Sequence, residues 1–245
     1  MHARFFTDMG PVRTRNEDAG GVYYNHTGQM LVVICDGMGG HNSGDIASKF
    51  VNDLIKARFC SENYIEQSNA EHWLKMNISD INRQLYQQSH QNNEHQGMGT
   101  TLVCALLFDH HVVIANVGDS RAYLIHHSEI RQVTHDHTFV NHLLMAGGLT
   151  KEEAKHHPQR NVITKVIGSD KRIHPDMFEY DYDRYQYLLL TSDGLTDYLE
   201  ETFIHEMIYA HDTVKAAGEA LIEAAVKAGA RDNISLVLVP LKGGE

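Results

Sequence analysis

Short apolar runs alternate with polar turns along this chain, and six of the runs have the length and composition of β-strands. They are rich in Val, Ile, Leu and Tyr and are often bounded by Gly, Asp or Asn, as strands commonly are. The runs cover residues 29–36, 100–108, 112–117, 121–125, 187–191 and 234–239.

Three longer stretches repeat their apolar residues at helical spacing. The first begins at Ser43-Gly44-Asp45 and includes Ile46, Val51 and Ile55. The second covers residues 69–88, with the side chains of Trp73, Met76, Ile81 and Leu85 predicted to point inward, and the third is the Ala-rich stretch 213–228. Strands occur in clusters and helices in pairs, which predicts an α+β protein with antiparallel sheets covered by helices.

Composition narrows the class of protein. The 245 residues suffice for one sizeable core, and a net charge of −11 provides no basic footprint for nucleic acid or an anionic membrane. Cys35, Cys60 and Cys104 lack C-x-x-C spacing, which argues against a zinc knuckle or disulfide framework and fits a reducing compartment. The chain does not open with a long apolar stretch, so we expect no signal peptide or membrane anchor. These features favour a single cytoplasmic domain over residues 1–245, and without a coiled-coil signature we expect a monomer.

Aspartates stand where several of the predicted strands end. Asp36, Asp119 and Asp193 each adjoin a glycine at the end of an apolar run, and Asp232 shortly precedes the last run. A strand holds such a carboxylate in place, and a neighbouring glycine lets a ligand or a carbonyl approach. Carboxylates brought together repel one another unless a cation neutralises them, and oxygen-only ligands suit magnesium, manganese or calcium better than zinc.

An Asp-Gly pair after a strand is also a common turn. For any one of these positions, a turn is the simpler interpretation. Their repetition, together with the acidic Glu17 and Asp18, makes a shared site for a hard divalent cation an equal alternative. The chemistry of the residues leaves both interpretations open.

Six short motifs then follow one another in a definite order. Residues 10–18 read GPVRTRNED and residues 36–41 read DGMGGH; the later motifs are GTT at 99–101, GDSR at 118–121, SDGL at 192–195 and RDN at 231–233. This order resembles that of the PPM family, the type-2C Ser/Thr protein phosphatases, from about residue 7 to residue 239. The chain is similar to compact housekeeping members from Firmicutes, which occur beside a Ser/Thr kinase.

The resemblance implies a four-layer α-β-β-α sandwich, with two antiparallel sheets flanked by pairs of antiparallel helices. It also implies a pair of divalent cations, manganese or magnesium, and in many bacterial members a third. Asp36 would bridge two metals, and the Gly37 carbonyl would bind one of them. The other expected metal ligands are Asp193 and Asp232 at the first metal, Asp119 with Asp193 at the third, and Asp18, which together with Glu17 would hold metal-bound water.

The resemblance further implies hydrolysis of phosphoserine and phosphothreonine in proteins, including a partner kinase and its targets. Water that bridges two metals loses its proton readily and can attack phosphorus in line. Arg13 would bind two phosphate oxygens. At the position where mostly eukaryotic members carry a histidine proposed as the general acid, this chain has Met38, which cannot donate a proton. The general acid is therefore unassigned, and His41 nearby is not placed.

Residues 141–161 resemble the flap that bacterial members place beside the active site. Gly147 and Gly148 would allow this segment to move, and Pro158 would end its short helix. We expect the flap to tune the choice of protein substrate and to interact with the third metal.

Three other functions compete with this one. A phosphodiesterase or nuclease is disfavoured by the acidic composition and the lack of a basic, aromatic-laced groove. A binding module that has lost catalysis is disfavoured because the ligand set and Arg13 are intact. A structural calcium site lacks an EF-hand loop and does not explain Arg13.

Overall fold

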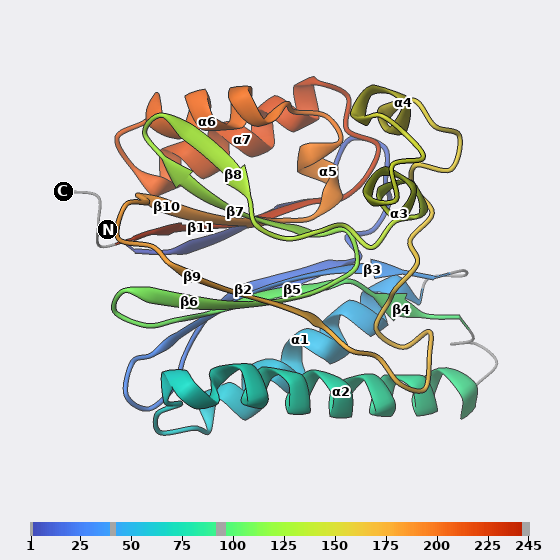
Figure 1. Ribbon diagram of the computed structural model, residues 1–245, viewed down its shortest axis with the longest axis vertical. Coiled ribbons are helices and arrows are strands. Elements are labelled where there is room, and N and C mark those ends of the chain that lie inside the picture. The colour runs from blue at the N-terminus through green and yellow to red at the C-terminus, as the bar shows by residue number, and fades with distance from the viewer. Residues whose placement is uncertain (1, 40–42, 92–96, 242–245) are drawn as a thin grey trace.

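Four layers make up this protein (Figure 1). A computed structural model describes residues 2–39, 43–91 and 97–241, so His41 of the second motif lies outside the described residues. Two sheets are stacked face to face, and helices cover the outer face of each sheet (Figure 1). The expected α-β-β-α sandwich is confirmed.

Each sheet is antiparallel. The first has the strand order β1-β11-β10-β7-β8, and the second has the order β2-β3-β5-β6-β9 with β4 paired to β3. The first sheet contains β1 (Arg4–Asp8), β7 (Arg121–His126), β8 (Glu129–Gln132), β10 (Tyr187–Thr191) and β11 (Ile234–Pro240). The second contains β2 (Asp18–Tyr24), β3 (Met30–Met38), β4 (Gly99–Thr100), β5 (Leu102–Leu107), β6 (His111–Val117) and β9 (Asp176–Asp181). Pairing of β1 with β11 brings the two ends of the described chain into one sheet.

The helices fall into three groups (Figure 1). Helices α1 (Gly44–Cys60) and α2 (Gln67–Gln91) cover the second sheet, and α6 (Glu201–Tyr209) and α7 (Val214–Lys227) cover the first. The short helices α3 (Phe139–Met145) and α4 (Lys151–Lys155) contact each other, and α5 (Asp193–Thr196) follows β10 and packs against α7 and β11. No helix in the described part of the chain has the length and hydropathy of a membrane span.

Strand β3 has an uninterrupted apolar sequence because it contributes side chains to two different cores. Leu31, Val33 and Cys35 pack in the core shared with α1 and α2. Val32 and Ile34 alternate with them and pack in the core between the two sheets. Both faces of the strand are therefore buried, and an unbroken apolar run results. The strand leaves the core at Asp36, which is part-exposed.

The predicted strands and helices are all present, but the prediction for α2 contains one error. Met76 is predicted to point inward, yet it is 58% exposed. The buried stripe instead follows Leu74, Ile78, Ile81 and Leu85 at spacings of three and four residues, which places Met76 on the opposite face. The apolar pattern does not predict strands β1, β2, β8 and β9, which are the outermost strands of the two sheets.

Candidate metal and phosphate site

Two neighbouring strands place the first pair of carboxylates. Asp18 on β2 lies directly opposite Asp36 on β3 in the antiparallel register. The main chain of Asp36 is held by Thr101, whose hydroxyl accepts from the Asp36 N–H at 2.9 Å and whose N–H donates to the Asp36 carbonyl at 2.8 Å. Asp18 is buried, and its Oδ2 accepts a 3.0 Å hydrogen bond from the hydroxyl of Ser192. The second sheet is thereby linked to β10 of the first.

Two further carboxylates come from the facing sheet. Asp193 is the first residue of α5, immediately after β10, and Asp232 precedes β11. The Ser192 hydroxyl also accepts from the N–H of Ser235 at 3.0 Å, which ties the ends of β10 and β11 together. Because both strand ends are fixed, the two aspartates are held on the same side of the sandwich as Asp18.

Asn233 joins the N-terminal loop to this strand end. Its buried side-chain amide donates to the carbonyls of Met9 and Arg15, both at 2.8 Å, and its Oδ1 accepts from the Glu17 N–H at 2.8 Å. These three bonds hold the loop carrying Arg13 and Glu17 against the carboxylates.

The fifth carboxylate, Asp119, follows Gly118 in the turn after β6. Gly118 has a φ of 106°, a conformation that favours glycine. Its N–H donates to Nδ1 of His137 at 2.9 Å, while Nε2 of the same ring lies 3.1 Å from Oδ2 of Asp176. Burial lowers the pKa of His137, which favours the neutral ring that this acceptor role requires. Lys165 donates to the other oxygen of Asp176 at 2.7 Å and completes the network.

The five carboxylates act on one another electrostatically. Burial is the largest cause of a raised pKa at Asp36, followed by the charges of Asp18 and Asp193. The pKa of Asp193 is also raised well above its ordinary value, first by burial and then by Asp119. Burial raises the pKa of Asp119 to about 7 and that of Asp18 to about 6. Such shifts indicate carboxylates that hold their charge poorly unless a cation accompanies them.

Three members of this group each have a buried oxygen without a hydrogen-bond partner among the described residues: Oδ1 of Asp18, Asp119 and Asp193. A buried polar atom without a partner is unfavourable by about 1–3 kcal/mol, and more when charged. No three His, Cys, Asp or Glu side chains of the described residues stand as a ready-made metal cage. The unpartnered oxygens nevertheless fit a hard divalent cation, which would supply the missing partner and offset the repulsion.

Arg13 is paired with one member of this group. Its Nη2 donates to Oδ2 of Asp232 at 2.7 Å, and its Nε donates to the carbonyl of Arg231 at 3.1 Å. The Arg13 side chain is 46% exposed. Its guanidinium therefore lies beside the carboxylates and is still accessible to solvent.

Gly37 lies where three segments meet. Its N–H donates to the carbonyl of Glu17 at 3.1 Å. A methyl group at Gly37 would stand 2.1 Å from the carbonyl oxygen of Gly44 at the start of α1 and 2.5 Å from that of Glu17. Only glycine fits this approach, which explains the Asp-Gly pair better than a turn does. Burial raises the pKa of Glu17.

The segment expected to form a flap contains α3 and α4 (Figure 1). Its base is closed by a bridge between Thr138 and Ile163 and by a 2.7 Å bond from the Thr164 N–H to the His137 carbonyl. Gly147 has a φ of 73°, whereas Gly148 does not have positive φ. Helix α4 ends at Lys155, before Pro158.

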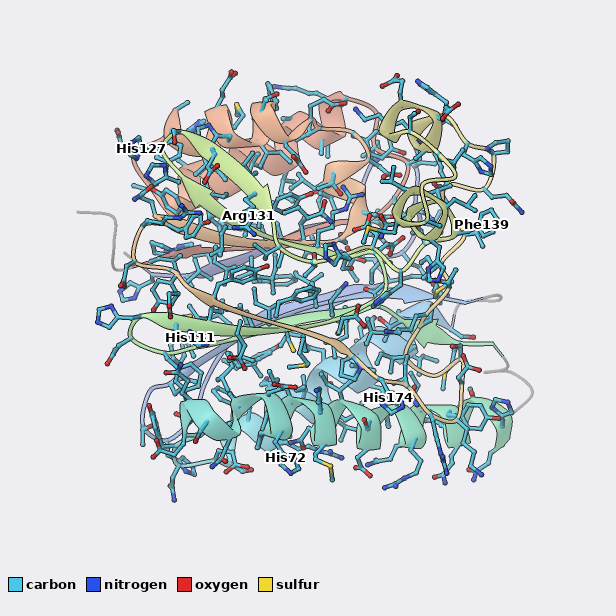
Figure 2. All side chains as sticks on the ribbon, in the orientation of Figure 1. His72, His111, His127, Arg131, Phe139 and His174 are labelled. Atoms are coloured by element: carbon cyan, nitrogen blue, oxygen red, sulfur yellow. The ribbon has the colours of Figure 1, made fainter. Side chains whose placement is uncertain are left out.

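Several supporting residues escape prediction from the sequence. Ser192 and Asn233 adjoin Asp193 and Asp232 in their motifs, which is the only available signal for them. His137 is one of 18 histidines, and surface composition is the simplest interpretation of most of them. The histidines labelled in Figure 2, His72, His111, His127 and His174, lie far apart on different elements of the molecule.

We compared the chain and its structure with known proteins, and the matches come from one family. Residues 12–229 match the family model described as protein phosphatase 2C. The chain is 38% identical over 240 residues to the serine/threonine phosphatase stp of Listeria monocytogenes, covering 98% of this chain and 95% of that protein. The crystal structure of the serine/threonine phosphatase Stp1 from Staphylococcus aureus superimposes with a TM-score of 0.96 at 54% identity, covering 99% and 96% of the two chains. The catalytic domain of PstP, in complex with 2 manganese ions, superimposes with a TM-score of 0.83 at 30% identity, over 97% and 96% of the two chains.

Proposed function

Because the chain belongs to the protein phosphatase 2C family and is a bacterial serine/threonine phosphatase, we propose that its carboxylate site is the active centre. There it hydrolyses phosphoserine and phosphothreonine in proteins. The observation that carries this assignment is the convergence of five mutually repelling carboxylates, three with unpartnered buried oxygens, beside an accessible guanidinium. The single positive charge of Arg13 does not balance five carboxylates and a phosphate substrate, so the site requires further positive charge.

We propose that manganese or magnesium supplies this charge. When bound, a pair of such cations supplies an acidified water as the nucleophile and offsets the charge of the phosphoryl oxygens. The PstP domain in complex with manganese supports a pair, and the unpartnered oxygen of Asp119 supports a third cation. The proposed ligands are Asp36 and the Gly37 carbonyl for the pair, Asp193 and Asp232 for its first member, Asp119 with Asp193 for the third, and Asp18 with Glu17 for the surrounding water.

Arg13 orients the phosphate in this proposal. Its planar group presents parallel N–H donors to two oxygens of a phosphate and keeps its charge at any working pH. The ion pair with Asp232 and the bond to the Arg231 carbonyl hold the guanidinium beside the proposed metal ligands. A phosphate bound by Arg13 is thereby held next to the carboxylates.

The role of Arg13 is tested by comparing Arg13→Ala with Arg15→Ala. Arg15 is a nearby exposed arginine in the same loop, so this variant is a matched control for loss of charge. We expect Arg13→Ala to lower kcat/KM on a phosphothreonine peptide by about 100-fold, as loss of a charged donor to the reacting group does. The control stays within about twofold of the wild type. Equal losses in both variants would mean that general surface charge, and not Arg13, binds the phosphate.

The remaining parts of the proposal concern the protein in its cell. Residues 1–245 act as one domain, and residues 141–161 act as a flap beside the active centre. The two hydrogen bonds between Gly118, which precedes Asp119, and His137 at the base of the flap support this position. A Ser/Thr kinase and its targets are the substrates, and the enzyme acts in the cytoplasm as a monomer. Three free cysteines support a reducing location.

A further inference from the structure

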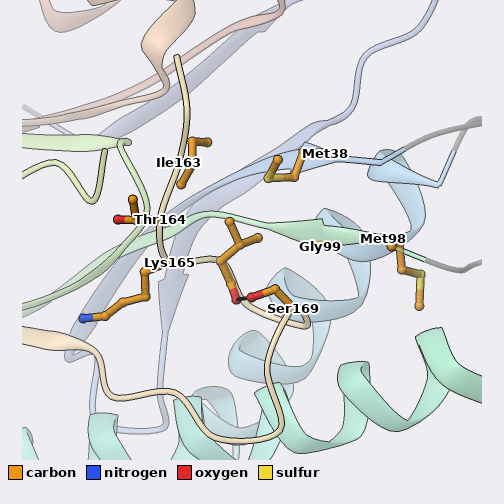
Figure 3. A pocket seen from close by; sticks show the side chains of 9 residues that line it. Met38, Met98, Gly99, Ile163, Thr164, Lys165 and Ser169 are labelled. Atoms are coloured by element: carbon orange, nitrogen blue, oxygen red, sulfur yellow. Dashed lines mark hydrogen bonds between the residues drawn. The ribbon is translucent and has the colours of Figure 1, made fainter. Parts of the chain in front are cut away.

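A cavity of about 330 Å³ opens beside the end of β3 (Figure 3). Its walls come from Met38 on β3, from residues 97–99 including the start of β4, and from the segment 163–169. Met38 lies only two residues beyond Asp36, so this cavity adjoins the proposed active centre. Its volume is within the range of small ligand pockets and accommodates a large apolar side chain.

Apolar side chains dominate the walls of this cavity. Met38 and Ile163 lie at its rim (Figure 3), and Val166 is buried within its wall. Lys165 extends away from them, and its ammonium is occupied by the carboxylate of Asp176 at 2.7 Å. The hydroxyl of Ser169 donates to the carbonyl of Val166 at 2.9 Å. Because Lys165 and Ser169 already have hydrogen-bond partners, neither is left to pair with a polar group in the cavity. An apolar side chain therefore matches the cavity best.

The cavity is held at a fixed distance from Asp36. Thr100 and Ile167 form a bridge with N–H to carbonyl distances of 3.1 and 2.9 Å. The Thr100 hydroxyl also donates to the Asp36 carbonyl at 2.8 Å. Gly99 permits this closeness, since a methyl group there would stand 2.7 Å from Cγ1 of Val166. The side of the pocket formed by Gly99 and Val166 is therefore fixed relative to Asp36.

We propose that this pocket binds an apolar side chain of the phosphoprotein substrate, two or three residues from the phosphorylated residue. Asp36 and Met38 are two residues apart along a strand, a separation of about 6.6 Å. An extended substrate spans the same distance in two residues, so a phosphoserine at the carboxylates places such a neighbour at the pocket. This inference rests on the proposed function and makes it specific: the enzyme selects extended phosphopeptides with Leu, Met or Phe near the phosphate.

A peptide series tests the specificity directly. One phosphothreonine peptide with serine at every flanking position is compared with versions that carry a single leucine, aspartate or lysine at each position from −3 to +3. We expect leucine at one position two or three residues away to raise kcat/KM about tenfold, a typical discrimination for an apolar pocket. A leucine effect below twofold at every position, or a larger effect of a charged residue at those positions, would overturn the proposal. Hydrolysis of an aryl phosphate in the same assay shows separately whether the active centre itself works.

A pair of variants ties any preference to the pocket. Ile163→Asp places a charge at the rim, and Val162→Asp makes the same change at the adjacent residue, which is 45% exposed and does not line the pocket. We expect Ile163→Asp to lower the leucine-to-serine ratio of kcat/KM at least fivefold and Val162→Asp to retain it. A ratio that persists in both variants would place the preference elsewhere. If Ile163→Asp melts below the assay temperature, the wild-type peptide series still decides the proposal.

Discussion

Individual side chains of this site are held in position by residues that are distant in the sequence. The motifs place Asp36 and Asp193 at strand ends, but the buried oxygens of Asp18, Asp119 and Asp193 that lack partners become visible only when β2, β6 and β10 are assembled. The same is true of His137, whose ring accepts the N–H of Gly118 from 19 residues away. These long-range contacts determine whether a carboxylate is merely in a turn or is held for a ligand.

His137 is expected to be a positioning residue for Asp119. In His137→Asn, the amide oxygen reaches the place of Nδ1 and continues to accept from Gly118, whereas His137→Leu loses this bond. We expect the Leu variant to need about tenfold more manganese for half-maximal activity, because loss of a residue that supports a metal ligand typically weakens metal binding by about this factor. The Asn variant should need within about threefold of the wild-type concentration. Titration of thermal stability with manganese gives a second measurement that does not depend on turnover. Identical behaviour of the two variants would show that the hydrogen bond to Gly118 is unimportant.

The sequence motifs group the acidic residues but say nothing of what supports them. Their order predicts that Asp18, Asp36 and Asp232 belong to one site, and in the folded chain these three carboxylates do act on one another. The metal that they would bind stays a prediction. The motifs do not reveal that Arg13 is paired with Asp232 or that Asn233 makes three side-chain hydrogen bonds. These hydrogen bonds join residues more than 200 positions apart. They depend on how the N-terminal loop packs against the start of β11, which a local residue pattern does not specify.

At the scale of elements, burial decides which strands are predictable from the sequence. Strands β3, β5 and β11 lie inside their sheets and have almost continuously buried residues, which produce clear apolar runs. The four strands that the pattern misses, β1, β2, β8 and β9, are the sheet edges. Strands β1, β8 and β9 consist mostly of part-exposed and exposed residues, which weakens their apolar signal. Strand β2 is more buried, but it reads DAGGVYY, and its two glycines interrupt the apolar run.

The flap is expected to influence protein substrates more than small ones. Its base is fixed by the Thr138–Ile163 bridge, so residues 141–161 can be exchanged for the flap of a relative while the bridge is kept. We expect such an exchange to change kcat/KM on phosphoproteins at least tenfold and on a small aryl phosphate less than threefold, because only a protein reaches beyond the proposed metal ligands. Assaying both substrates with one protein preparation makes the comparison. Equal changes on both would remove the flap from substrate selection.

At the scale of the whole molecule, the carboxylates link stability to pH and to metal. The raised pKa values of Asp18 and Asp119, about 6 and about 7, exceed those of ordinary aspartates. A raised pKa in the folded state stabilises the fold below the unfolded value, and this contribution is lost as the pH rises through the folded value. The metal-free protein is therefore destabilised as the pH rises from about 4 to about 7.

This linkage makes a measurable prediction. In excess chelator, the free energy of unfolding should fall between about pH 4 and about pH 7 by an amount on the order of several kcal/mol. Manganese should raise the melting temperature more at the upper end of this range than at the lower end, because it neutralises charges that repel only when ionised. Denaturant unfolding at each pH, with and without the metal, provides the test, and Asp119→Asn serves as the variant in which the slope is reduced. A flat dependence in chelator would contradict the raised pKa values.

The central claim is that the converging carboxylates hold the divalent cations on which catalysis depends. The most direct measurement pairs calorimetric binding of manganese with hydrolysis of a phosphothreonine peptide, for the wild type and for Asp193→Asn. We predict that the wild type binds the metal and loses all turnover in chelator, while the variant binds it more weakly and turns over about 1,000-fold more slowly, since charge stabilisation by metal is worth several kcal/mol. Full activity of the wild type in chelator, or wild-type binding and turnover in the variant, would contradict the assignment of this site.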